Sequence, residues 1–370
     1  MKKFLICLVC LALVGVACPF GVSALSISAK AAVVINGHTG EVIYSHNADT
    51  RLPMASTTKI MTALLLAECN TPEKEIVTTK EMVTVEGSSM GLLVGDRVTY
   101  NDLLYGMLLA SGNDAANTTA ICVGGSVDNF VRMMNERADK MGLHNTSFET
   151  PSGLDGENHY TTAYELALIA REAMKNKDFK KAASSKTARL CYGNPPYYRT
   201  LTNHNKLLGN YEGIVGVKTG FTKKSGRCLV SAAERGGEYV IAVTLNDPND
   251  WADHKQMLDY GFEKINVVEC IPPEIDPVLV AGGVKDRVKV KTQGFKIGAN
   301  VDGEVEVYTE IQPMLFAPVN KGQCVGKVEY YIGDTRLYSA DVTACENVKT
   351  KKNNLISRYI GCLYLILSSF

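Results

Sequence analysis

A hydroxyl and an amine lie three residues apart at Ser56 and Lys59, at the start of a long apolar stretch. Pro53 lies just upstream and residues 60–66 are apolar except for one threonine, which predicts a helix buried on nearly every side. Residues i and i+3 share a helix face, so the two side chains should meet. A lysine amine can take the serine proton only if burial or a nearby cation lowers the lysine pKa. The spacing therefore predicts an activated serine, whose own N–H in the first turn is available to an oxyanion.

A Ser-Gly-Asn turn supplies a second candidate pair, Ser111 and Asn113. It lies between a helix predicted to begin near Thr99 and a second helix that Asp114 can cap. Such a turn can place a hydroxyl and an amide in a cleft. Both S-x-x-K and S-x-N are expected about once by chance in such a chain, so an ordinary loop is the alternative for the turn.

Lys218, Thr219 and Gly220 form the third element, and Phe221 follows them. This tripeptide is expected by chance less than about once in ten such chains. On an edge strand the lysine and the threonine can hold a carboxylate by charge and hydroxyl, and the glycine lets another backbone approach closely. A surface lysine in a turn is the alternative, which the apolar residues just before the tripeptide disfavour.

The predicted elements place these residues in one α+β domain. The sequence predicts a hairpin of strands at 31–35 and 41–46, helices at 127–141, 161–176 and 251–262, and strands at 214–220, 227–233 and 238–245. Residues 150–159 are a loop rich in turn formers. Because the helices occupy the middle and the strands come from both ends, one antiparallel sheet should be completed by distant parts of the chain.

In this order the three motifs resemble those of the penicillin-binding proteins and serine β-lactamases. The flanking residues 53–62, 103–116 and 216–222 closely resemble the low-molecular-weight D-alanyl-D-alanine carboxypeptidases, a family like peptidase S11. The resemblance covers most of residues 31–262. It implies an α+β catalytic domain of that fold, an antiparallel sheet with a helical cluster. It also implies a serine-type hydrolase that removes the terminal D-alanine from peptidoglycan stem peptides ending in D-Ala-D-Ala and is inhibited by β-lactams.

The same resemblance implies the catalytic roles. Lys59 would take the proton from Ser56, whose oxygen would attack the penultimate alanine carbonyl and form an acyl-enzyme. Ser111 would relay the proton to the departing D-alanine. The backbone N–H groups of Ser56 and Phe221 would form the oxyanion hole, a role that tolerates any side chain at the second position.

Substrate binding is implied for a further set of residues. Asn113 would hydrogen-bond the peptide backbone, and Lys218 and Thr219 would bind the terminal carboxylate. Gly220 and Phe221 would lie along the same substrate-binding strand. We expect no metal and no cofactor, because the six histidines form no metal-binding pair such as H-E-x-x-H.

Three other functions remain open at this point. A class A β-lactamase shares the three motifs but uses a glutamate-directed water, and no Glu-x-x-x-Asn pattern surrounds Glu157 in the 150–159 loop. A non-turning-over penicillin sensor would need a signalling segment before the catalytic region. A structural wall-binding protein with relic motifs is disfavoured because all three motifs are intact.

Charge and cysteine usage exclude other classes. Lysine plus arginine and aspartate plus glutamate are both 39, and no basic stretch is interleaved with aromatic residues, which argues against a nucleic-acid partner. The cysteines are too widely spaced for a disulfide framework. Cys324 with Cys345 is the one pair considered for a bridge. Cys228, eight residues beyond Gly220, is expected to be a small buried side chain.

The chain divides into four predicted segments. Residues 1–24 read as a secretory signal peptide. Residues 25–270 form the catalytic domain, and residues 276–348, after a proline-rich connection, form a small all-β domain. Residues 349–370 form an amphipathic tail, too short to span a bilayer and preceded by basic residues. We expect export across the cytoplasmic membrane and anchoring by this tail at the extracellular face of the membrane.

Overall fold

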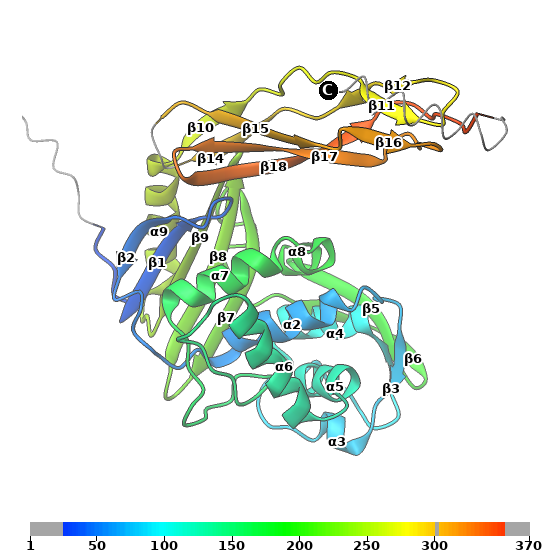
Figure 1. Cartoon of the computed structure of the whole chain (residues 1–370). Coiled ribbons are helices and arrows are strands. Elements are labelled where there is room, and N and C mark those ends of the chain that lie inside the picture. The colour runs from blue at the N-terminus through cyan, green and yellow to red at the C-terminus, as the bar shows by residue number, and fades with distance from the viewer. Residues whose placement is uncertain (1–24, 300–302, 352–370) are drawn as a thin grey trace, which may run out of the picture.

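The computed structural model describes residues 25–299 and 303–351. The predicted signal peptide and nearly all of the predicted anchoring tail lie outside these residues. No helix within the described ranges has both the length and the apolar composition needed to cross a bilayer. Figure 1 shows a helical cluster packed beside a sheet, with an elongated β domain across the top of the view.

One five-stranded antiparallel sheet organises the catalytic region, with strand order β2-β1-β9-β8-β7. Its strands are β1 (Ala31–Asn36), β2 (Val42–His46), β7 (Ile214–Thr222), β8 (Gly226–Arg235) and β9 (Glu238–Leu245). The pairing of β1 with β9 confirms that distant parts of the chain complete one sheet. β7 lies at the edge, as predicted, but continues past Gly220 to Thr222, so the lysine-threonine-glycine motif lies inside the strand.

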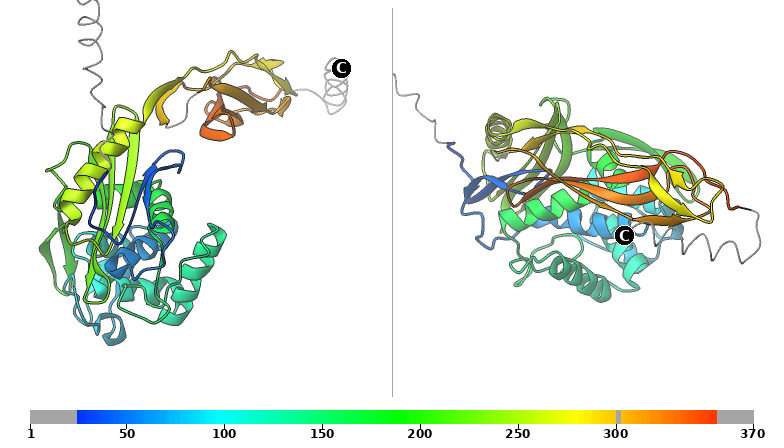
Figure 2. Two further views of the ribbon diagram at one scale, coloured as in Figure 1. Left: turned by 90° about the vertical axis from the view of Figure 1, so that its left-hand side faces the viewer. Right: turned by 45° about the horizontal axis from the view of Figure 1, so that its top comes forward.

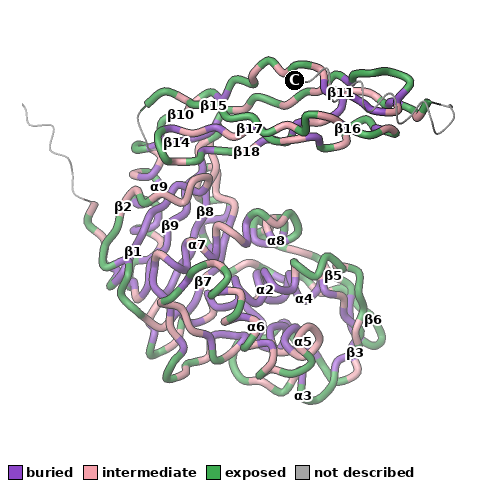
Figure 3. The backbone as a smooth tube through the Cα atoms, in the orientation of Figure 1, coloured by how far each residue is buried: buried purple, intermediate pink, exposed green. Residues whose placement is uncertain are grey.

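Helices pack on both faces of this sheet. They are α2 (Lys59–Glu68), α4 (Tyr100–Leu108), α5 (Asn113–Gly124), α6 (Val127–Lys140), α7 (Ala163–Ala173) and, on the opposite face, α9 (Asp250–Lys264). Every residue of α2 from Lys59 to Leu66 is buried, which confirms the prediction of a helix enclosed on all sides. Figure 3 shows this buried centre in purple.

Short elements complete the helical side, and the sequence patterns missed several of them. They are the 3-10 turn η1 (Ala55–Thr58), α3 (Lys80–Val83), α8 (Lys177–Ala183), β3 (Glu75–Val77), β4 (Arg97–Thr99), and the hairpin of β5 (Thr187–Gly193) and β6 (Pro196–Thr202). The 150–159 loop contains neither a helix nor a strand, as predicted.

The C-terminal region is an all-β domain with its own hydrophobic core. Its strands are β10 (Asn266–Cys270), β11 (Val278–Ala281), β12 (Arg287–Val288), β13 (Val290–Lys291), β14 (Phe295–Ala299), β15 (Glu306–Ile311), β16 (Met314–Phe316), β17 (Cys324–Ile332) and β18 (Thr335–Ala344). β10, within the range expected for the catalytic domain, pairs with β14. The backbone N–H of Gly298 donates to Gly237 O at 2.9 Å, which joins this domain to the β8–β9 turn. Figure 2 shows the β domain extending from one end of the catalytic region.

The Cys324–Cys345 bridge that the sequence suggested does not form. Both thiols are free, and Cys324 lies opposite Thr343 in the β17–β18 ladder. Its Sγ–H donates instead to Gly326 O at 3.4 Å. The two cysteines therefore contribute nothing covalent to the domain.

Candidate active site

Ser56 lies in the 3-10 turn η1, which continues directly into α2. The sequence placed it in the first α-helical turn, and the tighter turn retains the i, i+3 relation to Lys59. The Lys59 Nζ lies 3.0 Å from the Ser56 Oγ. Ala55 adopts a left-handed conformation with φ of 48°, which is unusual for a residue with a Cβ and marks a strained nucleophile turn.

The Lys59 amine is enclosed by hydrogen-bond acceptors. In addition to its contact with Ser56 Oγ, the Nζ donates to Asn113 Oδ1 at 2.7 Å and to Ser152 O at 2.6 Å. A neutral amine has two N–H donors and one lone pair. With both donors fixed by Asn113 and Ser152, the lone pair is directed at the serine hydroxyl. The site can therefore orient Lys59 as the base for Ser56.

Two buried lysines have lowered pKa values. The pKa of Lys59 lies well below its ordinary value, first because the amine is fully buried and second because of the charge of Lys218, while Asp114 opposes the shift. Burial lowers the pKa of Lys218 to about 7. The Lys218 Nζ donates to Ser111 Oγ at 3.0 Å and to the Thr219 carbonyl at 2.8 Å. The second and third motifs therefore meet through one ammonium group.

The turn between α4 and α5 presents Ser111 in a left-handed conformation with φ of 57°. Asn113 begins α5, and its Nδ2 donates to Glu86 O at 2.7 Å, so both halves of its amide have partners within the chain. Asn113 also donates its backbone N–H to Ser88 O at 2.7 Å. These contacts connect the second motif to the loop before it in sequence.

Gly220 lets β7 pass directly beside the nucleophile turn. A Cβ at this position would lie 3.0 Å from Met54 O and 3.1 Å from Ser56 N. Any side chain would push the strand away from the serine, which is the close backbone approach that the sequence predicted. The next residue, Phe221, is 66% exposed.

His159 supports the nucleophile turn from the 150–159 loop, and the sequence gave it no role. Its Nδ1 accepts from the backbone N–H of Glu149 at 2.9 Å, so the ring proton resides on Nε2, which lies 2.7 Å from Thr58 Oγ1. That hydroxyl in turn donates to Ala55 O at 2.8 Å. Burial lowers the pKa of His159 to about 4, so the ring is neutral at neutral pH. It is a positioning residue for η1.

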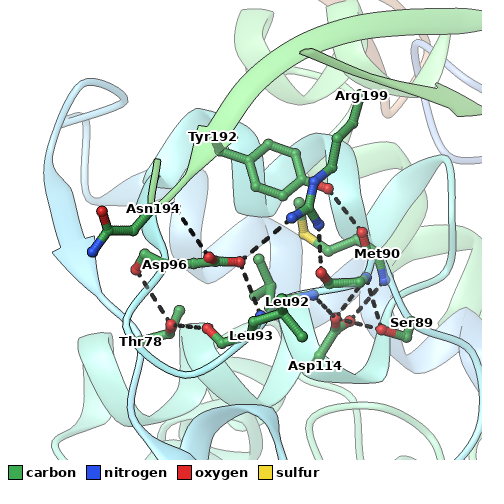
Figure 4. A network of polar contacts seen from close by, with 11 residues as sticks. Thr78, Ser89, Met90, Leu92, Leu93, Asp96, Asp114, Tyr192, Asn194 and Arg199 are labelled. Carbon is green, nitrogen blue, oxygen red and sulfur yellow. Dashed lines mark hydrogen bonds and ion pairs between the residues drawn. The ribbon is translucent and has the colours of Figure 1, made fainter. Parts of the chain in front are cut away.

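Asp114 hydrogen-bonds a neighbouring loop. The prediction that it caps α5 is wrong, because Gly112 occupies the N-cap position. The loop comprises residues 84–96 and is called the cleft loop here. The buried carboxylate accepts from the backbone N–H groups of residues 90–92 at 2.9 to 3.0 Å and from the Ser89 hydroxyl at 2.6 Å (Figure 4). A carboxylate suits this position because it only accepts. The sequence pattern could not reveal this, because the partners are more than twenty residues away.

Arg199 on β6 fixes the cleft loop from its other side. Its guanidinium lies 3.6 Å from the buried Asp96 carboxylate and 4.3 Å from the centre of the Tyr192 ring (Figure 4). It also donates to Gly91 O, and the Tyr192 hydroxyl donates to Met90 O at 2.8 Å. The β5–β6 hairpin, which the sequence did not predict, therefore packs against the cleft loop and stabilises it.

A cleft of about 340 Å³ contains five of the predicted site residues, Ser56, Ser111, Thr219, Gly220 and Phe221. Six further residues line it that the sequence did not single out: Ser88, His204, Lys206, Arg227, Asp250 and Trp251. They come from the cleft loop, the β6–β7 connection, β8 and the start of α9. Arg227 and Asp250 form an ion pair at 2.9 Å. Lys59, Asn113 and Lys218 lie behind this surface and contact its residues.

Cys228 lies opposite Gly220 in the β7–β8 ladder and is buried, as expected. Burial raises the pKa of its thiol to about 11, so the thiol stays protonated. The Sγ–H lies 3.8 Å from Pro53 O. The side chain packs beneath the nucleophile turn and has no reactive character.

Known proteins resemble this chain over most of its length. The family model of D-alanyl-D-alanine carboxypeptidases, peptidase S11, matches residues 19–249, and that of the penicillin-binding protein 5 C-terminal domain matches residues 280–350. The D-alanyl-D-alanine carboxypeptidase DacF of Bacillus subtilis is 33% identical over 350 residues, 88% of this chain and 87% of its own length.

Solved structures agree with these matches. Penicillin binding protein 5 from Haemophilus influenzae is similar with a TM-score of 0.64 and 28% identity, covering 89% of this chain and 100% of that chain. The Streptomyces K15 DD-transpeptidase is similar with a TM-score of 0.63 and 36% identity, covering 65% and 100%. The fold class expected from the motifs is therefore confirmed.

Proposed function

The chain belongs to the peptidase S11 family of D-alanyl-D-alanine carboxypeptidases, and on this premise we propose that Ser56 is the nucleophile with which it removes the terminal D-alanine from peptidoglycan stem peptides. The observation that carries this proposal is the 3.0 Å contact between Ser56 Oγ and the buried amine of Lys59. A serine attacks an amide only after losing its proton, and a lysine with a depressed pKa can accept that proton near neutral pH.

Acylation begins when Lys59 takes the Ser56 proton and the serine oxygen bonds to the penultimate D-alanine carbonyl. The backbone N–H groups of Ser56 and Phe221 stabilise the oxyanion that forms. The close approach of Gly220 to Ser56 N supports this, since it brings the two backbone segments together. The tetrahedral intermediate then re-forms the carbonyl group as the peptide C–N bond breaks.

The departing D-alanine needs a proton on its nitrogen and a partner for its carboxylate. Ser111 passes the proton to the amine, and the ammonium of Lys218, 3.0 Å from Ser111 Oγ, keeps that hydroxyl oriented. Lys218 and Thr219 bind the carboxylate. Asn113 binds the stem-peptide backbone by exchanging its Nδ2 contact with Glu86 O for a substrate carbonyl.

Water completes the cycle by attacking the acyl-enzyme, with Lys59 again within reach as base. A β-lactam acylates Ser56 in the same way but leaves no departing group, so slow deacylation makes it an inhibitor. The β-lactamase alternative requires a glutamate beside the acyl bond. Glu157 is exposed in the 150–159 loop and is not among the residues that line the cleft, which favours the carboxypeptidase.

We also propose that the chain is exported and held at the outer face of the cytoplasmic membrane by residues 349–370. The support is the amphipathic pattern and the basic residues of the tail. Liposomes containing anionic lipid should bind the chain ending at Phe370 and not the chain ending at Val348. Equal binding of the two would exclude the anchor.

The deciding experiment measures D-alanine release from an acylated Lys-D-Ala-D-Ala peptide by residues 25–348 and by the Ser56→Ala variant, together with fluorescent penicillin labelling. We expect release and labelling that both depend on Ser56. Labelling without release would favour a penicillin sensor, and rapid catalytic nitrocefin hydrolysis would favour a β-lactamase. Unchanged release by Ser56→Ala would reject the nucleophile assignment.

A further inference from the structure

The all-β domain contains a cavity of about 410 Å³, larger than the 340 Å³ of the catalytic cleft. Two segments line it, residues 291–295 from the end of β13 to the start of β14, and residues 338–341 and 343 of β18. It lies in the domain that Figure 1 shows across the top of the molecule, apart from the nucleophile turn. None of the proposed catalytic steps uses it.

The cavity exists because two neighbouring strands diverge. β18 pairs with β17 along its length, but on its other edge it pairs with β13 only at Thr343 and Ala344. The chain then turns away, and β14 pairs with β10 in a separate sheet. Within the described ranges, residues 338–342 therefore have no strand neighbour on the cavity side. A strand edge left open in this way has free backbone groups that can bind a ligand.

An aromatic surface forms one part of the cavity wall. The Tyr338 ring lies against Phe295 in a tilted arrangement, with ring centroids 3.9 Å apart and an interplanar angle of 55°. Phe295 and the buried Tyr330 ring form an edge-to-face pair with centroids 5.3 Å apart. Phe295 is thus held in place from both sides, while Tyr338 remains 45% exposed. A fixed, partly exposed ring is a flat surface on which the C–H face of a sugar can pack.

Polar side chains without partners form the rest of the wall. The side chains of Lys291, Gln293, Ser339, Asp341 and Thr343 make no hydrogen bond or ion pair with any described residue. The buried hydroxyl of Thr292 also has no partner. A buried polar atom without a partner is costly, so a ligand that supplies one would bind favourably here.

The charges and hydrogen-bonding groups select a class of ligand. One lysine and one aspartate balance each other, which favours a neutral ligand over an anion or a cation. The hydroxyls and the amide both donate and accept, which suits a molecule with several hydroxyl or amide groups. We propose that this cavity binds the neutral amino-sugar units of a glycan strand, with Tyr338 against one sugar ring. Asp341, which projects from the opposite face of β18, accepts from the hydroxyls of a neighbouring sugar unit at the open strand edge.

The identity of the glycan as that of peptidoglycan rests on the proposed function, because the stem peptide is attached to such strands. A second contact on the polymer would raise the effective concentration of stem peptides at the catalytic cleft. It should therefore accelerate hydrolysis of peptidoglycan and leave hydrolysis of a short soluble peptide unchanged. An extended peptide added to the open edge of β18 is the competing ligand.

The test titrates the full mature chain with tetra-N-acetylchitotetraose by calorimetry. We expect saturable binding that weakens about tenfold or more in Tyr338→Ala and in Asp341→Asn. Tyr308→Ala is the matched control, because this tyrosine is 56% exposed on β15 at the opposite edge of the same sheet. Its affinity for the sugar should equal that of the wild type.

A second readout separates this proposal from the proposed function. D-alanine release from a short peptide should be unchanged in Tyr338→Ala, while release from intact peptidoglycan should fall. No saturable binding of the sugar by the wild type, or equal binding by wild type and both variants, would overturn the proposal. Binding of a glycan-free peptide that Tyr338→Ala abolishes, with no sugar binding, would assign the cavity to strand addition instead.

Discussion

Replacing Asp114 by asparagine should release the cleft loop from the active site. The carboxylate is 1% exposed, and its two oxygens accept from the backbone N–H groups of residues 90–92, from Ala115 N at 2.9 Å and from Ser89 Oγ. An asparagine would turn one acceptor oxygen into a donor. Whichever oxygen is replaced, two backbone N–H groups lose their acceptor and face an amide that donates toward them.

Each buried donor left without an acceptor costs about 1 to 3 kcal/mol, so two cost about 2 to 6 kcal/mol. The loop can avoid this cost by opening to water, so the effect should appear as local opening. Amide exchange at residues 90–92 should then accelerate between about 30-fold and more than 10⁴-fold. Because Asn113 bonds Ser88 O and Glu86 O in the same loop, penicillin acylation should also slow.

Hydrogen exchange measured residue by residue is the assay, and Asp139→Asn is the control. Asp139 is exposed near the end of α6 and its carboxylate makes no hydrogen bond to any described residue, so its variant should exchange like the wild type. A second consequence is electrostatic. The charge of Asp114 raises the pKa of Lys59, so its removal should shift the acid limb of acylation to lower pH. Unchanged exchange at residues 90–92 in Asp114→Asn would refute the role given to this carboxylate.

Three further predictions follow from the same contacts. Peptide turnover should rise with pH as Lys59 loses its proton. It should fall above about pH 7, because Lys218 then loses the charge that holds the substrate carboxylate. A flat kcat/KM profile between about pH 5 and 9 would contradict both assignments. Burial lowers the pKa of His254 to about 3. Below about pH 6.5 the unfolded chain therefore binds more protons than the folded protein. As the pH falls through this range, the free energy of unfolding should decrease by up to about 1.4 kcal/mol per pH unit. Thermal unfolding of His254→Gln should show a weaker dependence on pH than the wild type, and an equal dependence would reject this explanation. Gly153→Ala would place a Cβ 1.9 Å from a carbonyl oxygen of η1, so penicillin labelling should fall at least about tenfold. Gly125 has a similar φ, but a Cβ there would meet no atom within 4 Å, so Gly125→Ala should lose stability only. Equal labelling of the two variants would contradict the contact.

Local patterns predicted much of the fold and part of the site. The i, i+3 spacing of Ser56 and Lys59 survived the change from an α-helical to a 3-10 turn, because both geometries bring such residues together. The nearly continuous apolar stretches of β8 and β9 were long enough to predict two buried strands, and the apolar residues before Lys218 predicted β7. The β5–β6 hairpin was missed because its strands are mostly exposed, and because Pro195 in the turn and Pro196 at the start of β6 are poor strand formers.

The chain's own sequence determined the reactive side chains, their order and the strand that carries Lys218, because these depend on neighbours a few residues away. Only the tertiary structure decided what surrounds them. Three features of the site join residues that are far apart in the chain. They are the contact between His159 and Thr58, the hydrogen bonds from the cleft loop to Asp114, and the position of Arg227 and Trp251 in the cleft wall. The same holds for the cavity beside Tyr338, which forms where the chain leaves β18 after β13 and β14 pairs with β10 instead. Periodicity records which face of an element is buried, but it carries no information about which distant element covers that face.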